Sequence, residues 1–375
     1  FRKKEYPAAI EEFQHLTQSY PKSPFVPASL LKIGDANYNL KKYGTAVENY
    51  SRIVKEFPKS IEAPDADYGI LLSFRQEKKY DPFISHVAAF LKKYPQHPLA
   101  GQVLTDLGSH YEQHRMREKS LKTYRELVQH SPNNELTEQA QFRIALLFKT
   151  ERRWNEALEE MEKFLKLYPK SQRTAESLVE AGELCLLLRD DSRALERFER
   201  ALQGHPQDPL TKRIYLGLEE GYRNLGKLDQ AEKASRELIA KFPNDDITYE
   251  GQLRLGLLAL PQKRFADAVN AFSAAIRSPD ERVASQAQFK VGETYQEMGS
   301  RDLAILQFSK VVYLYPYRTE MVEEALLRLG ALYIQEKKLP EAKQVYRKLM
   351  EKTKRGDRRE WAKKMIDQMD RGSIR

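Results

Sequence analysis

The pair His110 and His114 is the arrangement in this sequence that comes closest to a reactive site. Histidines at positions i and i+4 share one face of a helix and could supply two ligands to a metal ion. In zinc proteases a Glu directly follows the first His, but here Tyr111 does. A third ligand would have to come from His86 or His130, in neighbouring predicted helices. We therefore interpret the two histidines as structural and expect neither a metal ion nor a cofactor.

The other residue types that carry catalysis do not form a recognisable set. Gly251 and Gly256 have the outer spacing of a phosphate-binding loop, but Leu257 and Leu258 follow where that loop needs Lys and then Ser or Thr. Cys185 is the single cysteine, so the chain has no disulfide framework, and we expect this thiol to pack as a small hydrophobic side chain. The carboxylates are scattered over predicted helix surfaces. The sequence thus predicts a protein that is not an enzyme.

The elements that would hold these residues follow a repeat. Proline recurs every 37 residues through the first seven members of a series, and two further members follow at steps of 36 and 37. A fixed period of this length is typical of a repeat array in which each unit packs on its neighbours. Apolar residues inside a unit follow the 3.6-residue period of a helix. The series is Pro21, Pro58, Pro95, Pro132, Pro169, Pro206, Pro243, Pro279 and Pro316.

Small residues and rings recur at fixed positions inside the unit. A glycine follows many of the prolines by thirteen residues, and a small residue precedes most of them by twelve, with a ring four residues after it. The glycine and the small residue allow two helices to approach closely, and we expect the ring to fill the gap between successive pairs. Examples are Gly34, Ala46 and Tyr50, and then Gly182, Ala194 and Phe198.

The helix ends are predicted with the same period. Proline should end the second helix of each unit, and a capping residue two positions later should open the next helix. The predicted caps are Ser23, Ser60, Asn134, Ser171, Asp208 and Asp245. In three units a proline follows the capping position, as Pro24, Pro98 and Pro209, where it suits the first turn of a helix.

Taken together, these positions resemble the tetratricopeptide repeat family over essentially the whole chain. The resemblance implies an all-α fold, an α-solenoid in which TPR-like helix pairs form a right-handed superhelix. The chain departs from the family in its period of 37 residues, where the family has about 34. The second unit also has Leu71 and Phe83 where the small residues are expected, so we expect this unit to be either locally splayed or differently curved.

Counting units divides the chain into three parts. Residues 1–20 are expected to be the second helix of a truncated repeat, so that Phe1 would lie inside a longer array. Residues 21–353 would form nine helix pairs, and residues 354–375 a basic capping helix and tail. The segment from Lys352 to Arg375 holds nine Lys or Arg residues with acids interleaved among them, and the whole chain has a net charge of +9. This end is therefore either a solvated helix or a contact for a polyanion.

In the tetratricopeptide repeat family the first helices of the pairs line a concave groove, and the resemblance places a partner-binding stripe on the central units. This stripe is apolar and flanked by carboxylates, which suits a helix or an extended peptide with apolar anchors and some basic residues. Alternatively, the apolar members are buried by packing between units. The predicted groove residues are Phe142, Leu146, Lys149, Glu176, Val179, Glu183, Leu186, Arg213, Leu216, Glu220, Arg223, Asn224, Glu250, Leu253 and Leu257.

The compartment and the kind of partner rest on a narrower resemblance. The segments Tyr20 to Ser23 and Tyr168 to Ser171 both read Tyr-Pro-Lys-Ser, as in TPR proteins of the bacterial cell envelope. This implies a scaffold that binds a partner protein or peptide in the periplasm, associated with the outer membrane; a cytoplasmic location remains open. No apolar run approaches the ~18 residues that span a bilayer. The alternative function is binding of nucleic acid or an anionic surface through the basic end.

Overall fold

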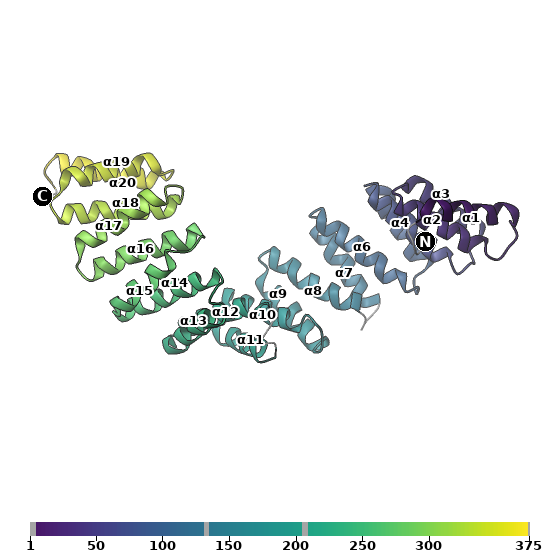
Figure 1. The fold of residues 1–375 in the computed structure, drawn as a ribbon, viewed down its shortest axis with the longest axis horizontal. Coiled ribbons are helices and arrows are strands. Elements are labelled where there is room, and N and C mark those ends of the chain that lie inside the picture. Colours follow the sequence, from purple (N-terminus) through teal and green to yellow (C-terminus); the bar gives the residue numbers. More distant parts are fainter. Residues whose placement is uncertain (1–4, 131–134, 205–208, 374–375) are drawn as a thin grey trace. The chain divides into compact units, whose positions relative to one another are not determined.

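The computed structural model describes residues 5–130, 135–204 and 209–373, and over these residues it contains helices and no strands (Figure 1). The predicted all-α class is confirmed, and the helices pack in pairs as in a TPR array. The chain divides into two compact units, residues 1–171 and 172–375, a division that the sequence did not predict.

In the N-terminal unit a single helix precedes four pairs. The helices are α1 (Tyr6–Ser19), α2 (Val26–Asn39), α3 (Tyr43–Glu56), α4 (Ala63–Gln76), α5 (Tyr80–Lys93), α6 (Leu99–Gln113), α7 (Arg117–His130), α8 (Glu135–Thr150) and α9 (Trp154–Leu167).

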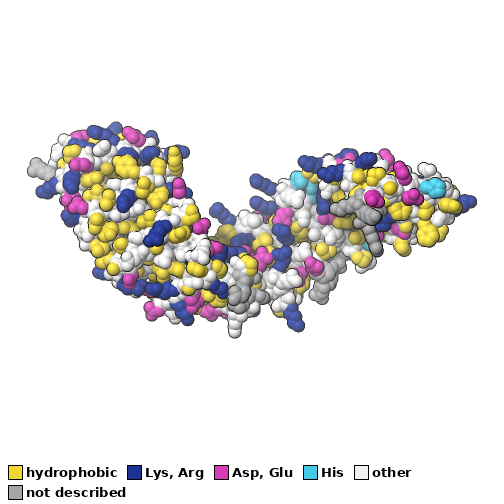
Figure 2. Space-filling view, viewed as in Figure 1, with side chains coloured by type: hydrophobic (Ala, Val, Ile, Leu, Met, Phe, Trp, Pro, Cys, Tyr) yellow, Lys and Arg dark blue, Asp and Glu magenta, His cyan; other side chains and the backbone are white. Residues whose placement is uncertain are grey.

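In the C-terminal unit five pairs precede a single last helix. The helices are α10 (Thr174–Leu187), α11 (Asp191–Gly204), α12 (Thr211–Asn224), α13 (Leu228–Lys241), α14 (Ile247–Ala259), the short 3-10 helix η1 (Leu260–Gln262), α15 (Phe265–Ala275), α16 (Glu281–Glu297), α17 (Arg301–Leu314), α18 (Thr319–Gln335), α19 (Leu339–Lys352) and α20 (Gly356–Asp370). Hydrophobic side chains gather over α16 and α18 on the face that Figure 2 shows.

Rings wedge between glycines of successive first helices. The fully buried ring of Phe198, on α11, lies between Gly182 of α10 and Gly217 of α12. A Cβ atom on Gly182 would lie 2.7 Å from a carbon of that ring, and one on Gly217 would lie 2.5 Å from another. Tyr50 lies in the same way between the first helices α2 and α4. The predicted role of the glycines and rings is therefore confirmed at these units.

The second unit deviates as expected. Leu71 and Phe83 replace the small residues, and both side chains are almost fully buried. The two helices that carry them, α4 and α5, pack less closely than the partners in the other pairs. Bulk at the closest approach holds the two helix axes apart, which is the physical reason for the predicted splaying.

The predicted capping residues lie in turns ahead of the helices, so this prediction was wrong in position. The residues at the helix starts are Phe25, Glu62, Arg173 and Asp246, and none of them caps with its side chain. Ser23 and Asp245 instead accept hydrogen bonds from backbone N–H groups two residues later, at 3.3 and 3.0 Å. A short turn after each proline delays the helix start. Asn134 and Asp208 lie outside the described residues.

The prolines of the first turns also differ from the prediction. Pro98 is the residue before the first helical residue of α6, and Pro24 and Pro209 lie in the turns before α2 and α12. Pro27 and Pro64 occupy the first turns of α2 and α4. At these positions the missing N–H group removes no helical hydrogen bond.

The turn inside most of the described pairs places a basic residue in the left-handed region, and two pairs use Gly226 and Gly299 there. Five such residues lie 37 positions apart in the chain and have φ between 57° and 62°. This conformation reverses the chain directly after the first helix. It also fixes the direction of a basic side chain at the same point of these five units. The five are Lys41, Lys78, Arg115, Arg152 and Arg189.

The last helix, α20, covers the final pair. Trp361 meets the buried ring of Tyr346 edge to face, with ring centres 5.3 Å apart. Ala362 and Met369 of α20 are buried in the same core. These contacts close the apolar end of the C-terminal unit, as a capping helix does in a repeat array.

Candidate functional site

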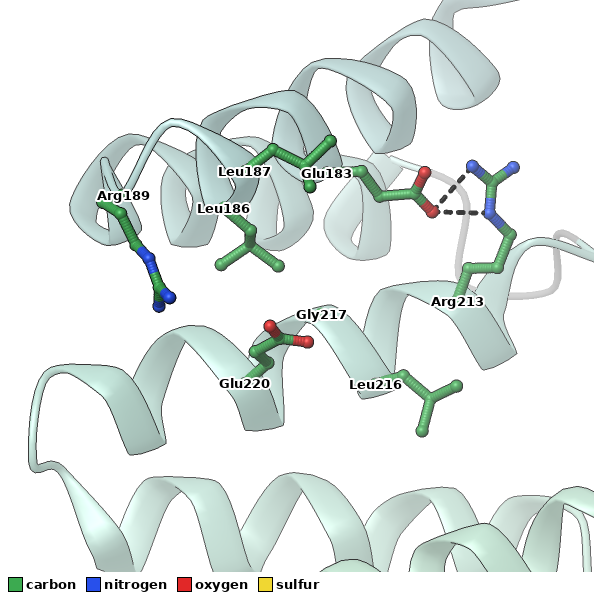
Figure 3. A pocket seen from close by; sticks show the side chains of 8 residues that line it. All are labelled: Glu183, Leu186, Leu187, Arg189, Arg213, Leu216, Gly217 and Glu220. Carbon is green, nitrogen blue, oxygen red and sulfur yellow. Dashed lines mark hydrogen bonds and ion pairs between the residues drawn. The ribbon is translucent and has the colours of Figure 1, made fainter. Parts of the chain in front are cut away.

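A hollow of about 440 Å³ lies between α10 and α12, the first helices of two successive pairs in the C-terminal unit (Figure 3). Five of the predicted groove residues line it together, so the structure brings these five to one place. They are Glu183, Leu186, Arg213, Leu216 and Glu220, and Leu187, Arg189 and Gly217 complete the lining.

The repeat explains why a hollow forms here. Gly217 has no side chain. The ring of Phe198 lies between α10 and α12 and holds the two helices apart. Leucine side chains from both helices then form the walls, and Leu187 is 53% exposed. An apolar surface of this kind, open to water, gains free energy when a partner covers it.

One carboxylate of the hollow is already engaged by the chain itself. Arg213 donates from Nε to Glu183, at 2.8 Å, and from Nη2 to Glu180, at 2.7 Å. Burial would lower the pKa of Arg213, but the two carboxylates more than offset this and raise it. Arg213 therefore stays charged and holds Glu183 in place (Figure 3).

Two other charges of the hollow have no partner among the described residues. Glu220 projects from α12 between the two helices, and Arg189 lies at the end of the hollow opposite Arg213 (Figure 3). Arg189 has φ of 62° and belongs to the series of basic residues in the turns. The hollow thus offers one negative and one positive side chain beside apolar walls.

Three of the predicted groove residues are buried instead of surface-exposed. Phe142 packs against Phe164 with ring centres 5.6 Å apart, and Val179 and Leu253 are almost fully covered. These side chains face the core of the unit to which each helix belongs, so the apolar residues at the edge of the predicted stripe become part of that core. The alternative that packing between units buries the apolar members is correct for these three.

The remaining predicted residues are accessible but lie outside the hollow. Leu146 and Lys149 belong to α8 in the N-terminal unit and are half-buried, as is Leu257 of α14. The charged and polar members bind neighbouring side chains. Glu176 pairs with Arg173, Arg223 with Glu219, Asn224 with Asp191, and Glu250 with Arg254 and Arg282.

A ladder of ion pairs connects the first helices of the C-terminal unit. In each step an Arg on one helix binds a Glu on the preceding first helix, about one repeat earlier in the chain. The ladder neutralises much of the charge that the sequence assigned to partner binding. Its pairs are Arg213 with Glu180 and Glu183, Arg254 with Glu219, Arg282 with Glu250, Arg328 with Glu293, and Arg358 with Glu323 and Glu324.

The histidines take part in packing. The ring of His110 is buried against Tyr80 and Phe83, with ring centres 4.9 and 5.3 Å away, and burial lowers its pKa. His114 lies with Nδ1 2.9 Å from the carbonyl oxygen of His110. His86 binds Asp67 at 2.5 Å. No cluster of three potential metal ligands occurs among the described residues, which do not include the side chain of His130.

Cys185 is fully buried in α10, in agreement with its predicted role as a packed side chain. It lies one residue before the predicted groove residue Leu186, yet the two side chains point in different directions. The helical turn of about 100° per residue separates a core position from a lining position here.

Sequence reasoning missed Leu187 and Arg189 as lining residues. Leu187 follows a predicted groove residue directly and ends α10, where the helix no longer has a neighbour to bury it. Arg189 belongs to a periodic series of basic residues that is visible in the sequence itself. Reading that period would have placed a cation at the end of the first helix in five successive pairs.

Family models match most of the chain. Residues 1–150 match the YfiO family, described as an outer membrane lipoprotein. Two tetratricopeptide repeat models match residues 220–282 and 253–319, and residues 139–171 and 324–352. None of the curated proteins matches the chain at a significant level. Within the described residues, no helix has both the length and the apolar character needed to cross a membrane.

Several solved structures are similar to this chain. A tetratricopeptide repeat protein from Parabacteroides merdae is 21% identical, over 77% of this chain and 99% of that one, with a TM-score of 0.44. PilW, described as a type IV pilus biogenesis factor, is 17% identical over 60% and 98%, with a TM-score of 0.47. PilF from Pseudomonas aeruginosa is 19% identical over 60% and 95%, with a TM-score of 0.45.

The repeat pattern, the glycine and ring packing between first helices, and the family models agree along the chain. The chain is a tetratricopeptide repeat protein, and its first 150 residues match an outer membrane lipoprotein family of that kind.

Proposed function

We propose that this chain is a non-enzymatic scaffold that holds a segment of a partner protein in the hollow between α10 and α12. The observation that carries the proposal is the hollow itself, where one exposed and two half-buried leucines lie between two charges that no described residue neutralises. Apolar anchors beside a few placed charges are what peptide grooves use for affinity and specificity.

The shape and charge of the hollow define the segment. Its volume of about 440 Å³ admits one or two side chains of a peptide and excludes a folded domain. An apolar side chain would pack between Leu186 and Leu216, with a basic group near Glu220 and an acidic group near Arg189. Glu183 contributes less, because a partner would have to displace Arg213 from it.

We place this activity in a bacterial cell-envelope complex on the periplasmic side of the outer membrane. The match of residues 1–150 to the outer membrane lipoprotein family supports this location. Fractionation of cells that produce the complete gene product with an epitope tag tests it. Recovery with the cytoplasmic fraction would refute the envelope location and would leave the proposal of partner binding in the hollow unaffected.

The basic C-terminal end gives little support to the polyanion alternative. Arg358 binds Glu323 and Glu324, Arg355 binds Asp357, and Lys343 binds Asp370. Arg359 donates to two backbone carbonyl groups. A polyanion would have to compete with these internal contacts for Arg355, Arg358 and Arg359, three of the nine Lys and Arg residues from Lys352 to Arg375.

The binding experiment uses a photo-crosslinking residue in place of Leu187, in cells that contain the natural partner. The crosslinked partner is identified, purified and titrated against the full chain. Leu216→Asp should weaken binding at least about tenfold, because it places a charge on an apolar wall. Leu225→Asp is the matched control, since Leu225 is exposed just beyond α12 and outside the hollow.

Two outcomes would refute the proposed function. Equal weakening by Leu216→Asp and Leu225→Asp would mean that the hollow has no special role. A loss of affinity that is steep in salt and insensitive to Leu216→Asp would favour the polyanion alternative. Glu220→Arg tests the charge separately and should select against a basic segment, whereas a reversal at Glu183 would also disturb Arg213.

A further inference from the structure

The outer face of α17 carries an apolar stripe that is open to solvent. Its members are Leu303 (43% exposed), Leu306 (49%), Tyr313 (71%), Leu314 (61%) and, just beyond the helix end, Tyr317 (88%). The four helical members lie within about 100° of one another around the helix axis, so they form one face. The opposite face, with Ala304, Phe308 and Val311, is buried in the core of the unit.

The other repeats show that the fold does not need apolar residues here. At the corresponding positions the second helices α3 and α9 carry charged or polar residues, with one leucine as the exception. Around α3 they are Thr45, Glu48, Lys55, Glu56 and Lys59, and around α9 they are Glu156, Glu159, Lys166, Leu167 and Lys170. A contiguous exposed apolar surface that packing does not explain is typical of an interaction site.

The positive charge on the stripe argues against pairing with a second copy of this chain. Lys310 is the one ionic residue between Leu303 and Tyr317 and lies at the midpoint of the stripe. A two-fold symmetric contact between two such stripes would place Lys310 against its own copy. Lys348 adds a second cation, 4.2 Å from the ring centre of Tyr313. Like charges at the centre oppose such a dimer.

The acidic residues at the edges of the stripe argue against binding to an anionic membrane. Asp302 and Glu341 are both exposed, and Glu341 lines a small hollow of about 160 Å³ together with Tyr313 and Lys348. An anionic lipid surface would press against these carboxylates as well as against the lysine. A narrow partner that lies along the stripe avoids them.

We propose that the stripe on α17 docks an amphipathic helix of a different protein, with a carboxylate at its centre facing Lys310. The stretch from Leu303 to Leu314 is about 16 Å long, which matches three turns of a helix. Leucines of the partner would pack on Leu306 and Leu314, and one side chain would enter the hollow beside Tyr313. This surface belongs to a second helix of a pair and is independent of the hollow between α10 and α12.

The test uses two synthetic helical peptides of about 16 residues, with leucines on one face and either Glu or Lys at the centre. Each is titrated against the full chain by fluorescence anisotropy. The Glu peptide should bind about two- to fivefold more tightly, as expected for one exposed ion pair. Lys310→Glu should reverse this preference, and this reversal identifies the contact with the stripe.

The stripe is removed by the double substitution Leu306→Glu and Tyr317→Lys. Both new residues occur at the same positions around α9, as Glu159 and Lys170, so the repeat tolerates them. Affinity for the Glu peptide should fall at least about tenfold. Ile61→Glu is the matched control, because Ile61 is an exposed apolar residue of the N-terminal unit, and it should leave the affinity unchanged.

Each of the other outcomes overturns the proposal. Absence of binding by both peptides up to about 1 mM would show that the stripe is no helix-docking surface. Equal affinity for the Glu and Lys peptides would show that Lys310 does not select a carboxylate on the partner helix. A dimer in sedimentation that the double substitution abolishes would assign the stripe to self-association. Sedimentation with phosphatidylglycerol vesicles, lost in the double variant, would assign it to a lipid surface.

Discussion

Replacing Gly217 by Ala tests the packing that shapes the hollow. A Cβ atom there would lie 2.5 and 2.8 Å from two carbons of the Phe198 ring, well inside ordinary contact distance. The ring cannot withdraw, because Gly182 lies equally close on its other side. Overpacking of this kind costs about 1–3 kcal/mol, whereas Ala in a helix interior gains about 1 kcal/mol over Gly. We expect a net destabilisation of up to about 2 kcal/mol.

Hydrogen exchange followed by mass spectrometry is the suitable assay, since repeat arrays do not unfold as one unit. Peptides from α10, α11 and α12 should exchange faster in Gly217→Ala. Gly44→Ala is the matched control, because Gly44 lies in α3 and a Cβ atom added there would meet no neighbouring side chain within 4 Å. It should slow local exchange slightly, by at most about 1 kcal/mol of helix stability.

The opposite signs of the two substitutions make the reasoning refutable. If Gly217→Ala slowed exchange as Gly44→Ala does, the ring of Phe198 would not be wedged between the helices. Adding Phe198→Leu to Gly217→Ala should relieve the clash and recover part of the lost protection. A further loss in that double variant would also contradict the account.

Three further substitutions test other parts of the structure. Arg254→Met should lower the free energy of unfolding of the C-terminal unit by about 2–3 kcal/mol in urea titrations, because it leaves the buried Glu219 with a single cationic partner. No change would mean that the ladder carries no stability. Burial raises the pKa of Asp67, but the hydrogen bonds and charges of His86 and Lys93 together outweigh burial and lower the pKa below 3.8. The stabilisation is therefore present above this pH and is lost as the pH falls through the lowered value. Asp67→Asn should reduce the loss of thermal stability at acidic pH, measured in circular dichroism melts. If the variant lost stability with falling pH as the parent protein does, Asp67 would not be the group responsible. Trp361→Ala should speed hydrogen exchange in α20 and leave α10 unaffected, and equal effects on both would show that the ring does more than cap.

The sequence predicted the fold to the level of single packing contacts. Phe198 and its two glycines could be recognised because the repeat places them at fixed intervals. The groove was predicted less well, since a first helix exposes only a narrow arc and one residue turns the side chain by about 100°. Cys185 is therefore core while Leu186, one residue later, lines the hollow.

The ladder of ion pairs was out of reach for a different reason. Local helix rules compare residues three or four positions apart, whereas Arg213 and Glu180 are 33 positions apart. Such a pair can be recognised only once it is known how each repeat packs on the next one. The sequence therefore overestimated the negative charge that a partner would meet at Glu183.

The ladder has a direction. Each first helix from α12 to α18 uses an Arg toward the preceding helix and a Glu toward the following one. The two sides of each repeat are thus complementary in charge. A unit copied in tandem by gene duplication would meet the matching charge on both sides and leave none buried alone. With this order of charges, whole repeats can be gained or lost during evolution while the ion pairs between first helices stay matched. A repeat with the reverse order of charges would not form these pairs.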